Sequence, residues 1–138
     1  MIRAVVDPGV LLAGLIAPRG ATSGIIRAWQ EGLFELVVSP HLLDELTKTL
    51  LRPKFRRWIT ENDAITFVEI LRLAAVVLDD ATTVEPISRD PHDDYLIALA
   101  RTAGAHVLVS GDADLTSIDG NEPPIVTPRR FLATLEAS

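Results

Sequence analysis

The stretch DPHDDYLIALARTAGAHVLVSGDADL, residues 90–115, places aspartates before one apolar run and after another. Its opening Asp-Pro pair is typical of a helix start and Gly104 of a helix end, so the first run predicts a helix over 92–104. The second run, residues 106–110, is continuously apolar and predicts a strand buried on both faces. A helix followed at once by such a strand is typical of a parallel α/β fold.

The same alternation extends in both directions along the chain. Short apolar runs rich in β-branched residues predict strands, and apolar residues at helical spacing predict helices. A capping box from Thr60 to Asp63 marks one helix start. We expect strands at residues 3–6, 33–39, 75–79, 106–110 and 124–127, and helices at 9–16, 23–32, 41–51, 64–74, 92–104 and 128–135.

This order predicts an α/β fold of three layers, α/β/α, with a mostly parallel sheet of about five strands and helices on both faces. The length of 138 residues suits one domain over residues 1–138. Hydrophobic residues make up 48% and aromatic residues only 5%, which indicates an aliphatic core. In open parallel sheets, ligands bind beyond the carboxyl ends of the strands.

Several classes of protein are disfavoured by composition. The chain has no cysteine, which excludes disulfides, thiolate metal sites and cysteine nucleophiles. No apolar stretch approaches the roughly 20 residues that cross a bilayer. The first apolar run is interrupted by Asp7 and Pro8 and lacks a basic region, so it does not resemble a signal peptide. We therefore expect a cytoplasmic protein with no membrane partner.

The formal net charge of -6 argues against broad electrostatic binding to nucleic acid. It does not exclude an enzyme that acts on nucleic acid. Where several carboxylates meet, divalent cations offset their charge and attract phosphate. The position of the acids relative to the strands is therefore the informative feature.

Two acids lie in the first half of the chain, close to predicted strand ends. Asp7 directly follows the first strand, although it is also well placed to cap the next helix. At 100° per residue, Asp44 points away from the leucine face of the helix over 41–51, whereas Glu45 lies on its margin and can reach a cleft.

The second half adds further acids. We assign Asp90 and Asp93 mainly to the helix start, and Asp94, one step beyond the cap, to ligand binding. Asp112 is closer to the strand end than Asp114 and ranks first. Carboxylates with no supporting cysteine or histidine cluster favour Mg²⁺ or Mn²⁺ over zinc.

The segments VVDPGVLLAGL, SPHLLDEL, LLRPKF and DPHDDYLIALARTAGAHVLVSGDADL resemble the PIN-domain family, in particular its toxins from bacterial toxin–antitoxin pairs. The resemblance runs from about residue 2 to 133. It implies a three-layer PIN-like fold and four catalytic, metal-binding acids. These match Asp7, Glu45, Asp94 and Asp112, with Asp114 as an auxiliary ligand and Ser110 orienting the fourth acid.

The resemblance also implies an activity. This activity is the Mg²⁺- or Mn²⁺-dependent hydrolysis of RNA by an endonuclease, which leaves a 5′-phosphate and a 3′-hydroxyl. The resemblance further implies that the protein is a homodimer and that a cognate antitoxin binds it. One motif departs from the family, because Pro8 and Gly9 stand where many members have Thr and Asn, which predicts thinner support for Asp7. Three alternatives stay open: an inactive binding module that holds a partner's arginine, a phospho-accepting receiver domain, and a DNA nuclease of the same fold.

The basic segment RPKFRRW, residues 52–58, has two interpretations. It is either a contact for RNA or antitoxin, with aromatic rings for stacking, or a solvated connection whose aromatics pack on the core. The residues of the first interpretation are Arg52, Lys54, Arg56 and Arg57.

Overall fold

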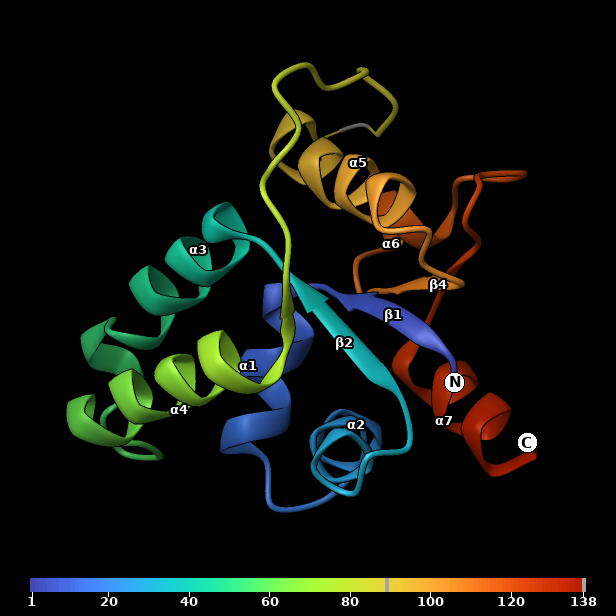
Figure 1. Cartoon of the computed structure of the whole chain (residues 1–138). Coiled ribbons are helices and arrows are strands. Elements are labelled where there is room, and N and C mark those ends of the chain that lie inside the picture. Colours follow the sequence, from blue (N-terminus) through green and yellow to red (C-terminus); the bar gives the residue numbers. More distant parts are fainter. Residues whose placement is uncertain (89, 138) are drawn as a thin grey trace.

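The computed structural model describes residues 1–88 and 90–137, which contain a parallel five-stranded sheet in the order β3-β2-β1-β4-β5 (Figure 1). Strands β1, β2 and β4 form its centre, and two-residue strands close both edges. The strands are β1 (Arg3–Val6), β2 (Glu35–Val38), β3 (Val76–Val77), β4 (Val107–Val109) and β5 (Ile125–Val126).

Helices cover both faces of this sheet, which confirms the predicted three-layer α/β/α class. In Figure 1, α5 lies on the opposite side of β1 and β4 from α1 and α2. The helices are α1 (Pro8–Ile16), α2 (Ala21–Gln30), α3 (Pro40–Leu50), α4 (Glu61–Ala74), α5 (Asp94–Thr102), α6 (Ala113–Thr116) and α7 (Pro128–Ala137), with 3₁₀ turns η1 (Pro53–Phe55) and η2 (Pro91–Asp93).

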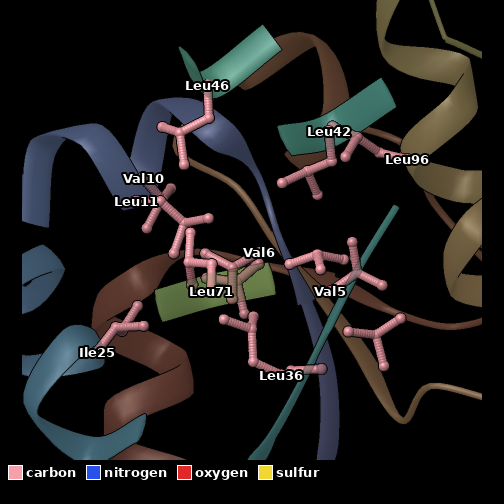
Figure 2. Close-up of a cluster of buried hydrophobic side chains, with 14 of the residues drawn as sticks. Val5, Val6, Val10, Leu11, Ile25, Leu36, Leu42, Leu46, Leu71 and Leu96 are labelled. Atoms are coloured by element: carbon pink, nitrogen blue, oxygen red, sulfur yellow. The ribbon is translucent and has the colours of Figure 1, made fainter. Parts of the chain in front are cut away.

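The core forms where aliphatic strands meet aliphatic helix faces. Val5 is fully buried and pairs with Val37 of β2 on one side and Leu108 of β4 on the other. Figure 2 shows Leu42 and Leu46 of α3 directed into the same cluster. These two leucines fix the rotation of α3, so that Asp44, with a side chain 65% exposed, faces solvent.

Polar side chains at the carboxyl edge of the sheet cap the N-termini of the helices that follow. Asp7 caps α1 after β1, Ser39 caps α3 after β2, and Asp112 caps α6 after β4, each by accepting a hydrogen bond from a backbone amide. Thr60 accepts from the Asp63 amide, as the capping-box pattern predicts. Local capping therefore brings polar side chains to the edge where parallel folds bind ligands.

Several element boundaries differ from those predicted. Residues 92–104 do not form one helix, because the Asp90 cap and Pro91 wind the first turn as η2 before α5 begins. The strand expected at 75–79 is reduced to two paired residues, since beyond Leu78 the chain leaves β2. Gly104 adopts a φ of 62°, which suits its predicted place just after the helix.

Within the described residues, no single helix is long and apolar enough to span a membrane, although α1 and α2, bent by 93°, reach that length and composition together.

Candidate active site

A cavity of about 410 Å³ opens at the carboxyl edge of the sheet, and Asp7, Asp93 and Asp112 are among the residues that line it. The three aspartates come from the end of β1, from η2 and from the turn after β4. Gly111 also lines the cavity, as do Thr22 and Pro128 from the N-terminal turns of α2 and α7. Another cavity of about 420 Å³, beside Trp29 and Phe67, has none of the predicted acids.

Asp7 is held by two donors. The Gly9 amide donates to Oδ1 at 2.8 Å, and Ser110 Oγ donates to Oδ2 at 2.8 Å. The Pro8–Gly9 departure therefore leaves Asp7 supported, because the backbone supplies the first of these bonds. Burial raises the pKa of Asp7, and the charges of Asp112 and Glu45 add to this, against the two hydrogen bonds that lower it.

Ser110 joins two of the acids. It is fully buried at the end of β4, and its Oγ accepts a hydrogen bond from the Asp112 amide at 3.0 Å while donating to Asp7. Asp112 Oδ1 in turn accepts from the Asp114 amide at 2.9 Å, which caps α6. The structure thus places Ser110 as an orienting group between Asp7 and Asp112, and Asp114 supports Asp112 through its backbone.

Asp93 lies in this cavity, although the sequence assigned it to helix capping. Its side chain makes no capping hydrogen bond, and its buried Oδ2 has no hydrogen-bond partner. The pKa of Asp93 is raised to about 7, first by burial, then by a hydrogen bond shared with Asp112, and then by neighbouring carboxylate charges. An unpaired oxygen in an acidic cavity is a suitable ligand for a cation or a proton.

The structure does not place the Asp94 side chain with the other acids. Asp94 is 3% exposed, and its Oδ1 accepts hydrogen bonds from the amides of Ile87 and Ser88 and from Ser88 Oγ, at 3.2, 2.7 and 2.8 Å. It braces the segment that precedes η2. Asp90 accepts from the His92 amide at 3.0 Å, as expected of a cap.

Glu45 approaches the aspartates from α3. Its side chain is 41% exposed, and its charge contributes to the raised pKa of Asp7. Tyr95 donates its hydroxyl to Glu45 Oε2 at 2.8 Å, and burial together with this bond raises the pKa of Tyr95. Glu45 is not among the residues that line the cavity, so its expected place in the cleft rests on this charge effect on Asp7.

The basic segment lies elsewhere, where η1 joins the ends of α3 and α4 that point away from the sheet (Figure 1). At 1.5 Å per residue, α3 separates it from the carboxyl edge by roughly 16 Å. Arg56 is tied to the end of α3 through hydrogen bonds to the carbonyls of Leu50 and Arg52. The exposed cations are Arg52, Lys54 and Arg57.

The acids fit a hard divalent cation by chemistry. Within residues 1–88 and 90–137, no three acidic or histidine side chains already have the spacing of a metal cluster. Burial raises the pKa of Asp7 and of Asp93, and neighbouring carboxylate charges add to both shifts. A cation would offset these negative charges, and Mg²⁺ and Mn²⁺ prefer carboxylate oxygens as ligands.

Asp93 lines the cavity with Asp7 and Asp112, although the sequence predicted Asp94 in this place. Asp93 and Asp94 are adjacent in the sequence, and which of them faces the cavity depends on how the start of the helix is rotated. A 3₁₀ turn advances about 120° per residue instead of 100°. The Asp-Pro pair before Asp93 was the only sequence signal for such a turn.

Comparison with known proteins bears on the family and the fold of the chain. The family model described as "PIN domain" matches residues 3–114. An uncharacterized protein of Methanocaldococcus jannaschii is 27% identical to this chain over 145 residues. The match covers 98% of this chain and 92% of that protein.

Two crystal structures have a similar fold. PAE2754 from Pyrobaculum aerophilum has a TM-score of 0.62 at 16% identity, with 99% of this chain and 91% of that chain covered. VapBC2 from Rickettsia felis, bound to a DNA fragment from their promoter, has a TM-score of 0.59 at 9% identity, with coverage of 91% and 97%.

Proposed function

The chain belongs to the PIN-domain family, and from this premise we propose that residues 1–138 form one domain that is a Mg²⁺- or Mn²⁺-dependent endoribonuclease. The observation that carries the proposal is the meeting of Asp7, Asp93 and Asp112 in one cavity from three separate parts of the chain. Helix capping alone would not require these three carboxylates to share a cavity.

The cation would be held by Asp7, Asp93 and Asp112, with Glu45 completing the set or orienting a water. When bound, it lowers the pKa of water and stabilises charge on the phosphoryl oxygens. Ser110 keeps Asp7 and Asp112 in fixed orientations through its two hydrogen bonds. Asp94 fixes the backbone before η2 and so positions Asp93.

The biological role we propose is that of the toxin in a toxin–antitoxin pair, acting on RNA in the cytoplasm. The motif resemblance supports it, as does the likeness in fold to VapBC2. A homodimer is proposed as well. Phe67 and Leu71 of α4 are core residues, but Ile65, Ile70 and Leu73 on the same helix are at least 48% exposed and offer an apolar contact.

The test compares Asp93→Asn with Asp94→Asn and, as a control on solvent-facing α3, Asp44→Asn. Each protein is titrated with Mn²⁺ by calorimetry and assayed on a structured RNA pool with Mn²⁺, Mg²⁺ or EDTA. We expect Asp93→Asn to lose Mn²⁺ binding and cleavage, Asp44→Asn to keep both, and Asp94→Asn to melt at a lower temperature.

Other outcomes select the alternatives. Mn²⁺ binding without cleavage of any RNA, together with cleavage of single-stranded DNA, would replace the ribonuclease by a DNA nuclease. Absence of both Mn²⁺ binding and cleavage in the wild type would favour the inactive binding module. Unchanged cleavage by Asp93→Asn would overturn the site assignment.

A further inference from the structure

Glu45 is held by two side chains that lie outside the aspartate cavity. We propose that Tyr95 and His41 are positioning residues that fix the Glu45 carboxylate beside Asp7, an inference that rests on the proposed metal-dependent function. Neither residue was singled out as a site residue from the sequence. Tyr95 lies in α5, two residues after Asp93 of η2, and His41 lies in α3, which also carries Glu45.

Each oxygen of Glu45 faces a different partner. Oε2 accepts the hydrogen bond from Tyr95 at 2.8 Å, and Oε1 lies 3.8 Å from His41 Nε2. Tyr95 is 50 residues from Glu45 in sequence, whereas His41 is one helical turn before it. The Tyr95 contact is a hydrogen bond, whereas the His41 contact is too long for one and acts through charge when His41 is protonated, so Tyr95 is the main restraint on the carboxylate.

The two partners also hold one another. The His41 and Tyr95 rings lie 4.1 Å apart between centroids and are inclined by 52°. The His41 amide donates to Asp80 Oδ2 at 2.8 Å, which ties the first turn of α3 to the chain after β3. His41, Tyr95 and Asp80 therefore connect α3, α5 and the chain after β3 around Glu45.

The start of α5 connects this group to the cavity. Asp93, Asp94 and Tyr95 are consecutive, and successive side chains point in well-separated directions around the helix axis. Asp93 lines the cavity, Asp94 binds the segment at Ile87 and Ser88, and Tyr95 binds Glu45. One helical turn thus sets the positions of two site acids together.

The consequence is preorganisation of a flexible acid. A glutamate side chain that is 41% exposed would otherwise sample several rotamers and would lose that freedom on binding a cation. Holding it in advance removes this entropy cost from the binding step. Outer partners of this kind typically contribute about 10-fold to 100-fold in metal affinity or activity.

The principal variant is Tyr95→Phe, which keeps the ring contact with His41 and removes only the hydroxyl. Thr47→Val is the matched control, because it removes a hydroxyl hydrogen bond to the Leu43 carbonyl on the same helix. In metal-free protein, NMR couplings of the Glu45 side chain should show one dominant rotamer in wild type and Thr47→Val, and averaging in Tyr95→Phe. His41→Phe, which retains a ring but removes Nε2, should give a smaller effect.

Mn²⁺ titration then tests what the positioning does. We expect Tyr95→Phe to bind Mn²⁺ about tenfold more weakly than wild type. Adding Tyr95→Phe to Glu45→Gln should cause no loss beyond that of Glu45→Gln alone, because Tyr95 acts through Glu45. Equal rotamer averaging in wild type and Tyr95→Phe would overturn the proposal, as would equal Mn²⁺ affinity. A wild type that binds no Mn²⁺ would refute the proposed function, while the metal-free rotamer comparison would still decide the positioning.

Discussion

Ser110 Oγ donates to Asp7 Oδ2 at 2.8 Å across 103 residues of sequence. The contact arises because β1 and β4 are parallel neighbours, with Val6 opposite Val109, so that the residues after both strands meet. The same oxygen accepts from the Asp112 amide. One buried hydroxyl therefore sets the orientation of two site acids.

Replacing this hydroxyl should weaken both the site and the fold. Ser110→Ala removes the donor to Asp7 and the acceptor for the Asp112 amide, so we expect a loss of about 1–3 kcal/mol in the free energy of unfolding and roughly tenfold weaker Mn²⁺ binding. Urea unfolding and calorimetry measure the two effects. Ser23→Ala, at another buried serine bonded to the Gly20 carbonyl, should change stability but leave Mn²⁺ binding intact.

Stability without metal should fall as the pH rises from about 4 to 7. The pKa of Asp93 is raised to about 7 from 3.8, so the folded protein binds more protons than the unfolded chain in this window, and deprotonation favours unfolding. Asp93→Asn should flatten this part of the profile and raise stability at pH 7.5. Because Asp93 is partly exposed, solvent screening reduces the gain to about 1 kcal/mol.

The check is thermal unfolding in EDTA across pH 4–8, with Asp44→Asn as the control that should retain the wild-type slope. Burial raises the pKa of Asp7 as well, so some pH dependence should persist in Asp93→Asn. A wild-type stability that rises steadily from pH 4 to 7 would contradict the prediction.

Gly14 should not accept a side chain. A Cβ at this position would lie 2.4 Å from the Thr22 carbonyl oxygen and 2.8 Å from Ile26 Cγ1, so α1 and α2 would have to separate. We expect Gly14→Ala to cost about 1–3 kcal/mol in unfolding free energy. Gly24→Ala is the comparison, since its Cβ meets only the movable end of Leu132 at 2.7 Å, and it should cost less.

Exposed cations near the acid cavity should contribute to RNA binding, whereas those at the far end of α3 should not. Arg129 and Arg130 are exposed directly after Pro128, which lines the acid cavity, whereas Arg52, Lys54 and Arg57 lie at the far end of α3. Replacing Arg129 and Arg130 by alanine should reduce the salt dependence of RNA binding by a slope of about 1.4, if each contacts one phosphate. Replacing the three distant cations should leave that slope unchanged.

Arg56 should behave differently from its neighbours. Its guanidinium binds the Leu50 and Arg52 carbonyls at the end of α3, so Arg56→Ala should lower stability by about 1–2 kcal/mol without altering RNA affinity. Urea unfolding alongside the binding assay separates these effects. Weaker RNA binding by a fully folded Arg56→Ala protein would restore the contact interpretation for this residue.

The sequence by itself determined the fold class and the edge of the sheet at which the candidate site lies. Buried β-branched runs alternating with capped helices admit few arrangements other than a parallel sheet covered on both faces, and such a sheet binds ligands at its carboxyl edge. Asp7 directly follows β1, and Asp112 lies in the short turn after β4, so both come to this edge through their local connection to a strand. Glu45 followed from the leucine face of α3, because that face must be buried.

Only the tertiary structure decided which of Asp93 and Asp94 lines the cavity. They are adjacent and chemically identical, and the side chain that reaches the cavity depends on how η2 winds and on which backbone amides capture the other. The pairing of Tyr95 with Glu45 and of Ser110 with Asp7 was equally hidden, since these contacts span 50 and 103 residues. Local sequence sets caps and periodicity, whereas contacts between distant elements depend on how strands and helices pack.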